Sequence, residues 1–429
     1  MRLLDRIKAV DPARVALVTD AGRLTFGDLA QTPPMGGARL VLHTPDVALA
    51  LRVLLAMDGN GGQVTLSSPS LDADTLANVV TQVGATLVRG IADVAGLTEN
   101  FRPEIFSDGR TDWLMMTSGT TGVPKLVQHS LDSLTRSTRT DMAKGAGQVW
   151  GLLYDYTRFA GLQVVLQSLL SGATLVAPST DIPLDLRIAL LAQAGCTHLS
   201  ATPTLWRKIL MTPGYQALAL RQITLGGEIA DDAVIGSLSR AYPDARISHI
   251  FASTEAGVGF SVTDRRMGFP ASYLTDPPMG IALRVVDDHL HVRNDAVGAD
   301  YLGGQGAVAQ DGWVNTGDVV EVTHDRVLFR GRSSGVINVG GDKVHPEEVE
   351  RAVLSHPSVR LARIYAKANP IVGALVAADI VVEPGVESGA LREELKGYLA
   401  ARLARHMVPA FIRFVPDFDM NSAGKLKRT

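Results

Sequence analysis

The eleven residues from Met115 to Lys125 combine hydroxyl groups, glycines and a lysine that could hold a chain of phosphates. They read Met-Met-Thr-Ser-Gly-Thr-Thr-Gly-Val-Pro-Lys and follow the apolar pair Trp113-Leu114, which indicates a buried strand. Glycines let backbone N–H groups turn towards one centre, hydroxyl groups add donors, and lysine adds a point charge. The run Pro124-Lys125-Leu126 denies the loop the helix start that the common nucleotide-triphosphatase motif needs. The segment therefore predicts another kind of polyphosphate site, against the alternative of a flexible linker.

Three later segments add groups that could bind a nucleotide. Leu225-Gly226-Gly227-Glu228 ends a predicted strand, and its two glycines would let a flat ring approach the backbone. The segment 250–255 reads Ile-Phe-Ala-Ser-Thr-Glu and ends on a hydroxyl group and a carboxylate. The segment 311–318 reads Asp-Gly-Trp-Val-Asn-Thr-Gly-Asp. An aspartate just beyond a tight turn can accept two hydrogen bonds from vicinal hydroxyl groups.

In this order, together with residues 328–346 and the C-terminal pair Gly424-Lys425, these segments resemble the adenylate-forming superfamily. Its members are acyl- and aryl-CoA synthetases, the adenylation domains of peptide synthetases, and firefly luciferase. The chain looks most like the AMP-dependent acyl-CoA synthetases, and the resemblance covers residues 113–428. Leu126 and Ala252 stand where that family usually has glycine.

The resemblance implies a role for each matching residue. The residues that would contact the nucleotide are Thr117, Ser118, Gly119, Thr120, Thr121, Gly122, Lys125, Gly226, Gly227, Glu228, Phe251, Ala252, Ser253, Asp318, Arg332 and Lys343. Lys425, Glu255 and Thr254 would be catalytic, and Glu255 would also hold Mg²⁺. The acid pocket would be lined by Tyr156, Thr157, Gly161 and Gly257, although the histidine that many relatives have at Thr157 is absent.

The implied function is an AMP-forming acid–thiol ligase. ATP with Mg²⁺ would activate a small fatty or aryl carboxylic acid, and the acyl group would pass to coenzyme A or to the phosphopantetheine of an acyl carrier protein. Two alternatives stay open at this point. Asp155 could hold the ammonium group of an amino acid, although its spacing to Gly172 is long for that role. The chain could also be a non-catalytic nucleotide-binding homologue, given Leu126, Ala252 and a short N-terminal region.

The alternation of apolar strands with amphipathic helices predicts an α/β fold. The resemblance implies a large N-terminal AMP-binding domain, residues 1–332, and a smaller mobile α+β lid, residues 333–429, with Ser334 at the hinge. The elements predicted with bounds are strands 15–19, 39–42, 360–366 and 373–382, and helices 46–57, 130–139, 163–170 and 389–405.

Composition excludes several classes of protein. The formal net charge of −3 over 429 residues gives no electrostatic reason to expect a nucleic acid or an anionic membrane as partner. The single cysteine, Cys196, excludes a disulfide framework, and its apolar surroundings predict a buried structural thiol. No apolar run reaches the ~18 residues of a membrane span, so we expect a cytoplasmic protein.

Three competing motifs fail on their context. Gly331-Arg-Ser-Ser-Gly335 matches a hydrolase nucleophile elbow, but a strand rather than a helix should follow it. Gly304-Gln-Gly306 fits a loose dinucleotide pattern without room for the required helix. His289 and His291 share a strand face, with no third metal ligand evident.

Overall fold

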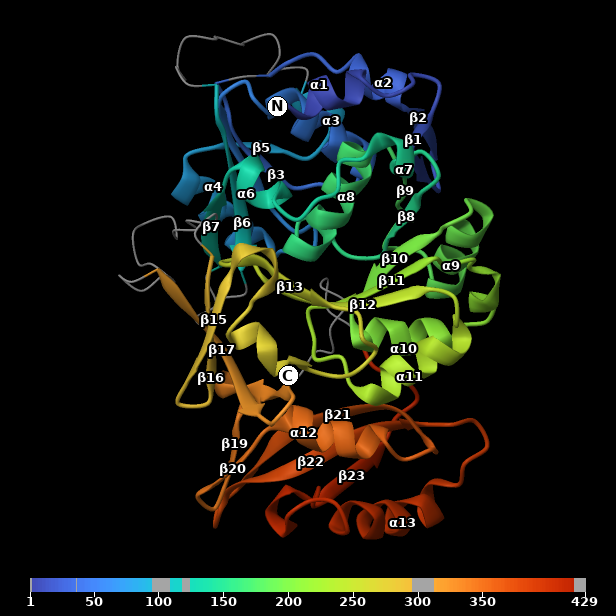
Figure 1. Ribbon diagram of the computed structural model, residues 1–429, viewed down its shortest axis with the longest axis vertical. Helices are drawn as coiled ribbons and strands as arrows, with labels where there is room; N and C mark the ends of the chain where they lie inside the picture. The colour runs from blue at the N-terminus through green and yellow to red at the C-terminus, as the bar shows by residue number, and fades with distance from the viewer. Residues whose placement is uncertain (1, 36, 95–108, 118–123, 295–311, 420–429) are drawn as a thin grey trace.

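The computed structural model describes residues 2–35, 37–94, 109–117, 124–294 and 312–419. Figure 1 shows an upper part, coloured blue to yellow, in which helices and sheets alternate, and a smaller lower part, coloured orange to red. The lower part packs two helices against one sheet. The predicted fold class, a large N-terminal α/β part with a smaller α+β C-terminal part, is confirmed.

A five-stranded sheet in the order β5-β3-β4-β6-β7 carries the predicted phosphate loop. Its strands are β3 (Arg39–Leu42), β4 (Gly62–Leu66), β5 (Thr86–Val88), β6 (Thr111–Thr117) and β7 (Lys125–His129). Strands β3, β4, β5 and β6 run parallel, whereas β7 returns antiparallel to β6. Since β6 ends at Thr117 and β7 begins at Lys125, the loop joins two paired strands at the edge of the sheet.

A second sheet has eight strands in the order β13-β12-β11-β10-β8-β9-β1-β2. Its strands are β1 (Val15–Thr19), β2 (Gly22–Thr25), β8 (Val149–Leu152), β9 (Thr174–Val176), β10 (His198–Ala201), β11 (Gln222–Gly226), β12 (Arg246–Ser253) and β13 (Gly257–Val262). The strands from β12 to β1 are parallel to their neighbours, and β13 and β2 are the antiparallel edges. The carboxyl ends of the parallel strands therefore open on one edge, where ligands of α/β proteins usually bind.

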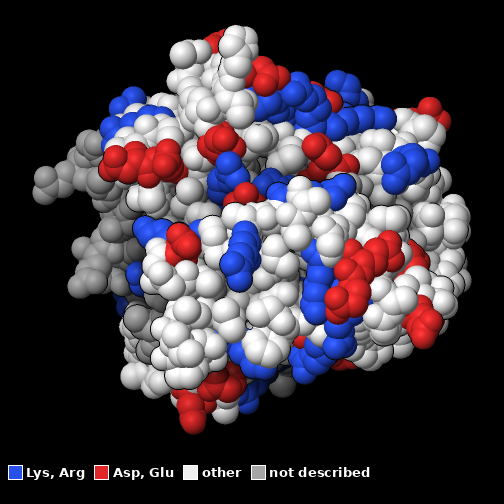
Figure 2. All heavy atoms as spheres, turned by 90° about the horizontal axis from the view of Figure 1, so that it is seen from below, with Lys and Arg blue, Asp and Glu red and all other residues white. Residues whose placement is uncertain are grey.

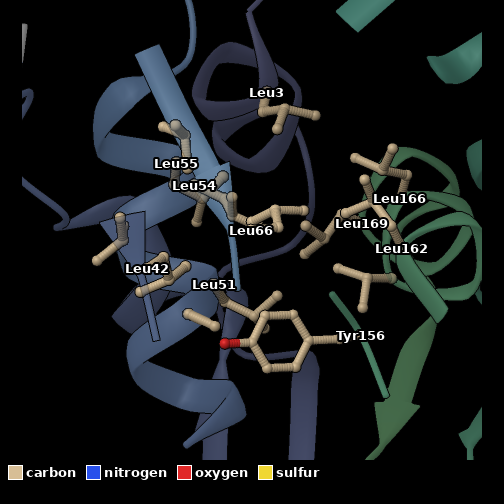
Figure 3. Close-up of a cluster of buried hydrophobic side chains, with 14 of the residues drawn as sticks. Leu3, Leu42, Leu51, Leu54, Leu55, Leu66, Tyr156, Leu162, Leu166 and Leu169 are labelled. Carbon is tan, nitrogen blue, oxygen red and sulfur yellow. The ribbon is translucent and has the colours of Figure 1, made fainter. Parts of the chain in front are cut away.

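Helices fill the space between these two sheets and cover their outer faces (Figure 1). They are α1 (Leu3–Lys8), α2 (Phe26–Ala30), α3 (Val47–Met57), α4 (Ala73–Val83), α6 (Leu131–Thr135), α7 (Met142–Gly145), α8 (Phe159–Ser171), α9 (Leu184–Gln193), α10 (Pro203–Met211) and α11 (Asp232–Ala241). The apolar faces of α3 and α8 meet in the largest core cluster, to which Leu54 and Leu166 belong (Figure 3). A second cluster packs α9, α10 and α11 against the eight-stranded sheet.

The remaining two sheets follow in the sequence. One has the order β14-β18-β17-β16-β15 and comprises β14 (Phe269–Pro270), β15 (Ala282–Val286), β16 (His289–Arg293), β17 (Trp313–Val322) and β18 (Arg326–Arg332). The other comprises β19 (Ile337–Val339), β20 (Asp342–Val344), β21 (Val359–Asn369), β22 (Gly373–Val382) and β23 (Phe411–Phe414). Helices α12 (Pro346–Leu354) and α13 (Ser388–Ala400) pack on this last sheet around Val349 and Leu395.

Most predicted elements are confirmed, with three errors at helix ends. The strands 15–19, 39–42 and 373–382 have the predicted bounds, and Asp46 caps α3 as an N-terminal residue should. The helix expected over 130–139 ends at Thr135, because the following run of Ser and Thr favours turns. The helix expected from residue 163 begins at Phe159. The helix expected to reach residue 405 ends at Ala400, and a separate 3-10 turn, Arg405–Met407, follows.

Cys196 lies in the core as predicted. Its side chain is buried between β10, β8 and the helices behind them, and burial raises the pKa of the thiol to about 12. A thiol that stays protonated at neutral pH is a poor nucleophile. The prediction of a structural cysteine is confirmed.

Candidate nucleotide and acid site

The two ends of the predicted phosphate loop are held side by side. Thr117 pairs with Lys125 across β6 and β7, so these two residues lie within a few ångströms of each other. Ser118, Gly119, Thr120, Thr121 and Gly122 lie outside the described residues. Leu126 is buried in an apolar cluster with Met116 and α4, which explains a large side chain at this position.

The carboxyl ends of β11 and β12 lie next to each other and carry two of the predicted segments. Gly226 pairs with Ile250, and the backbone of Gly227 turns away at φ 80°. Beyond it, Glu228 Oε2 accepts a hydrogen bond of 3.0 Å from the backbone N–H of Thr204, which fixes the turn against the start of α10. This anchored, glycine-lined turn leaves backbone exposed beside β12, as a flat ring would require.

Strand β12 leads into the turn that carries Thr254 and Glu255. Ser253 ends the strand, and its Oγ accepts a hydrogen bond of 3.0 Å from the N–H of Ala256. Gly257 begins β13 with φ 69°, a conformation that glycine adopts without strain. The turn therefore presents a hydroxyl group and a half-buried carboxylate from fixed backbone.

Phe251 joins this turn to the third sheet. Its ring is stacked between Phe260, at 5.2 Å between centroids, and Phe329 of β18, at 5.7 Å. Phe329 lies three residues before Arg332, so the aromatic stack brings the segment around Asp318 towards β12. Ala252, the next residue, is packed against the core.

Asp318 and Arg332 form a preorganised pair. They are register partners on β17 and β18, and Arg332 Nε lies 2.9 Å from Asp318 Oδ1. Thr316 supports both partners, since its Oγ1 accepts from the Asp318 N–H and its carbonyl accepts from Arg332 Nη1. Asp318 is almost buried whereas Arg332 is mostly exposed, so the carboxylate is held and the guanidinium is accessible.

The structure does not bring every predicted residue to this place. Lys343 is on the β19–β20 hairpin, at the end of the molecule away from β12 in Figure 1. Lys425 lies outside the described residues. Their roles stay predictions.

The predicted pocket residues Tyr156, Thr157 and Gly161 are buried. Figure 3 shows the ring of Tyr156 directed into leucines of α3 and α8, and its hydroxyl donates to the carbonyl of Thr44 at 2.7 Å. Gly161 is packed so closely on the backbone of Asp155 that a Cβ would lie 2.2 Å from the Asp155 carbonyl oxygen. All three residues are therefore buried beneath the surface, and their contact with an acid stays a prediction.

Two residues next to Phe159, His129 and Arg158, were not predicted from the sequence. His129 at the end of β7 is buried, and its Nε2 has no hydrogen-bond partner among the described residues. Burial lowers the pKa of its imidazole to about 4, although the backbone of Thr254 opposes the shift. The ring lies 6.1 Å from that of Phe159, between centroids. Arg158, just before Phe159, is the second residue. A histidine four residues after the loop lysine was the available signal.

Among the described residues, no group of three or more His, Cys, Asp and Glu side chains could hold a metal ion. The carboxylate of Glu255 nevertheless fits Mg²⁺, because this ion is commonly held by one or two carboxylates together with phosphate oxygens and waters.

No helix in the described part of the chain is long and apolar enough to cross a membrane. Basic and acidic side chains are interspersed on the face shown in Figure 2, as the small net charge predicts.

Comparison with protein families identifies the chain. The family model described as AMP-binding enzyme matches residues 95–309, and that of the AMP-binding enzyme C-terminal domain matches residues 348–425. The chain therefore belongs to the AMP-binding enzyme family. The resemblance to adenylate-forming enzymes is confirmed.

Individual relatives are distant. The isonitrile lipopeptide synthase of Streptomyces coeruleorubidus is 28% identical over 74% of the chain but only 23% of its own length. The fatty acid–[acyl-carrier-protein] ligase ScoC of the same organism is 27% identical over 73% of the chain and 65% of its length. The chain thus spans less than two thirds of either relative.

A solved structure shows the same fold. The anthranilate CoA ligase AuaEII, in complex with anthranoyl-AMP, superposes with a TM-score of 0.78 over 99% of the chain and 95% of its own. The identity is 17%, so this likeness establishes the fold and not the substrate.

Proposed function

We propose that the chain is an AMP-forming acid–thiol ligase. A carboxylate would attack the α-phosphorus of ATP, giving acyl-AMP and pyrophosphate. A thiol, of coenzyme A or of a carrier protein's phosphopantetheine, would then attack the acyl carbon and release AMP. The observation that carries the proposal is the convergence around Phe251 of the β11 turn, the Thr254–Glu255 turn and the Asp318–Arg332 pair, within a chain of this family.

The nucleotide would lie along these segments. Adenine would rest on the backbone of the Gly226–Glu228 turn, and the two ribose hydroxyl groups would donate to Asp318. Arg332, exposed beside Asp318, would reach the ribose and the α-phosphate. The β6–β7 loop would enclose the terminal phosphates, with the Lys125 ammonium as a point charge.

The first step needs charge neutralisation and an in-line approach of the acid. Mg²⁺ held by Glu255 would screen the triphosphate, and the hydroxyl of Thr254 would donate to the α-phosphate. Lys425 would bridge the attacking carboxylate and the α-phosphate. Each of these is a group preorganised where negative charge develops, which is where such groups lower a barrier.

The second step would need the C-terminal part to move as a lid after residue 332. In this structure ion pairs hold that part in place: Arg330 Nη1 lies 2.7 Å from Glu348 Oε1, and Lys208 Nζ lies 2.8 Å from Asp417 Oδ1. Partly exposed pairs of this kind contribute about 0–1 kcal/mol each, so they can break during turnover. Lys343, now distant, would replace Lys425 near the nucleotide.

Asp155 supports a fatty or aryl acid over an amino acid. Its Oδ1 accepts from both the N–H and the hydroxyl of Thr157, at 2.9 and 2.7 Å, and its Oδ2 accepts from Ser68 Oγ at 2.6 Å. A carboxylate with three such donors is a poorer ligand for a substrate ammonium group than a free one.

With one buried cysteine and no disulfide, we place the protein in the cytoplasm.

Exchange of labelled pyrophosphate into ATP tests the proposal. Purified protein with MgATP should catalyse exchange with one or more acids from a panel of fatty, aryl, dicarboxylic and amino acids. A matched reaction without acid gives the background. Absence of exchange with every acid would contradict the ligase and favour a non-catalytic nucleotide-binding homologue, and exchange with amino acids alone would favour an amino-acid-activating enzyme.

A further inference from the structure

The guanidinium of Arg158, which has no carboxylate partner among the described residues, lies between the phosphate-loop strand and α8. Nη1 of Arg158 donates to the backbone carbonyl of Met116 over a long 3.4 Å, one residue before the loop motif. Its Nε is buried and has no hydrogen-bond partner in the described part of the chain. Leaving a buried N–H of a charged group unpaired is costly, so such a group needs an explanation.

The nearest acidic side chain in the sequence does not pair with Arg158. Asp155 uses one carboxylate oxygen for Thr157 and the other for Ser68. The charges of Asp155 and Arg158 therefore sit close in the chain without an ion pair between them. Within the described residues, the carboxylate of Asp155 is therefore occupied and the guanidinium of Arg158 has no carboxylate partner.

Arg158 lies at the N-terminus of α8, a position that favours binding of an anion. Arg158 is the N-cap residue of this thirteen-residue helix, and no side chain caps that end. A helix N-terminus carries partial positive charge, so a cation there is unfavourable and an anion is favourable. At the opposite end of the same helix, Arg14 Nη1 donates to the Gly172 carbonyl at 3.1 Å, where a cation is favourable.

Arg158 is only partly buried and lies in the sequence between Thr157 and Gly161, two residues of the predicted acid pocket. The next residue, Phe159, contacts the ring of His129, of which only 3% is exposed. His129 faces the backbone of Thr254, which the proposed function puts at the α-phosphate. Arg158 itself reaches the carbonyl of Met116 on the phosphate-loop strand, so its guanidinium lies between that strand and the start of α8.

We propose that Arg158 binds a second anionic group on the acid, so that the substrate is a dicarboxylate or another acid with two negative charges. This inference rests on the proposed function. The proposed function already assigns the reacting carboxylate to Lys425, so the Arg158 guanidinium remains for a second anionic group. A second carboxylate would accept charge-assisted hydrogen bonds from the Arg158 guanidinium and would also be stabilised by the N-terminus of α8.

The test compares matched acids in pyrophosphate exchange. Dicarboxylates from malonate to sebacate and phthalate are each paired with the monoacid that lacks one carboxylate, such as propionate for succinate and benzoate for phthalate. The protein should favour at least one diacid over its monoacid by about 10- to 100-fold in kcat/KM, the range expected for one charge-assisted interaction. Arg158→Gln should remove that preference while leaving the KM for ATP unchanged, and Arg158→Lys should restore part of it.

Arg14→Gln is the matched control, because it removes a similar guanidinium–carbonyl contact at the other end of α8. It should leave the diacid preference intact. Monoacids equal to or better than diacids would overturn the inference while the ligase survives. So would an Arg158→Gln variant whose loss falls equally on all acids, or on ATP. Absence of exchange with every acid would instead defeat the proposed function itself.

Discussion

Two groups of arginine side chains in the described part of the molecule differ in whether a carboxylate of the chain pairs with them. In the C-terminal sheet, fully buried Asp379 accepts from Arg363 Nη2 at 2.5 Å and from Arg413 Nη2 at 2.7 Å. Burial would raise the pKa of this carboxyl, but the two guanidinium groups hold it below its usual value. In the N-terminal part, the one hydrogen bond that Arg158 makes among the described residues is a long one to the carbonyl of Met116.

The difference separates structural charge from charge kept for a ligand. The Asp379 cluster ties β21, β22 and β23 together with groups from the chain itself, and therefore can act only on stability. Arg158 lies at a helix N-terminus beside the phosphate-loop strand, and an anion from outside would complete it. Burial and partners, rather than residue type, distinguish the two.

Removing the carboxylate of Asp379 should have the largest effect on the free energy of unfolding. Asp379→Asn would leave Arg363 and Arg413 without their shared charge, and breaking a buried ion pair costs about 3–5 kcal/mol. Urea unfolding should show that loss, whereas ATP affinity of the folded protein should be unchanged. The control is Asp325→Asn, whose exposed pair with Arg266 should be worth less than about 1 kcal/mol. Equal small losses in both variants would break the comparison.

The next effect concerns His129, a buried imidazole held neutral by desolvation. Its folded-state pKa of about 4 lies below the ordinary 6.5, so below pH 6.5 the unfolded chain binds more protons. Stability should therefore fall as pH drops from 6.5 towards 4, with His129 contributing on the order of 3 kcal/mol.

His129→Asn should flatten this acid limb in denaturant unfolding measured between pH 4 and 7. The exposed His324→Asn serves as its control and should leave the limb unchanged. An unaltered limb in the His129 variant would mean that its imidazole is not held neutral in the folded protein.

Asp318 is an intermediate case, since its partner Arg332 belongs to the chain but is exposed. Asp318→Ala should remove the acceptor for two ribose hydroxyl groups and weaken ATP by at least about tenfold, or about 1.4 kcal/mol. Its effect on unfolding should stay below about 1 kcal/mol, because the Arg332 guanidinium is mostly exposed and water screens its attraction to the carboxylate. Calorimetric titration with ATP and urea unfolding measure the two quantities. A stability loss without an affinity loss would make this pair structural.

The motifs were accessible from the sequence because their chemistry is local. Glycine at position 257 and the Thr-Glu pair before it are determined by one turn, and the structure shows that turn as a short connection from β12 to β13. The capping of α10 by Thr202, with Pro203 in its first turn, is equally local. Short-range rules of this kind account for the fold class and for most strands.

The rest depends on contacts between distant segments. Tyr156 was expected to line the acid pocket; the sequence does not show that its hydroxyl donates to the carbonyl of Thr44, over 112 residues of separation. Nothing near Arg158 in the sequence shows that its Nε is buried or that Asp155 turns to Ser68. Tertiary packing decides which polar groups remain without a partner, and therefore which of them can serve a ligand.

Transfer of oxygen from the acid to AMP tests the central claim most directly. In the proposed reaction the carboxylate oxygen that attacks the α-phosphorus stays with AMP when the thiol displaces it from the acyl carbon. With an acid labelled with ¹⁸O in its carboxylate, mass spectrometry should find one labelled oxygen in each AMP formed. Formation of ADP with label in inorganic phosphate, or of AMP without label, would contradict activation of an acid as its adenylate.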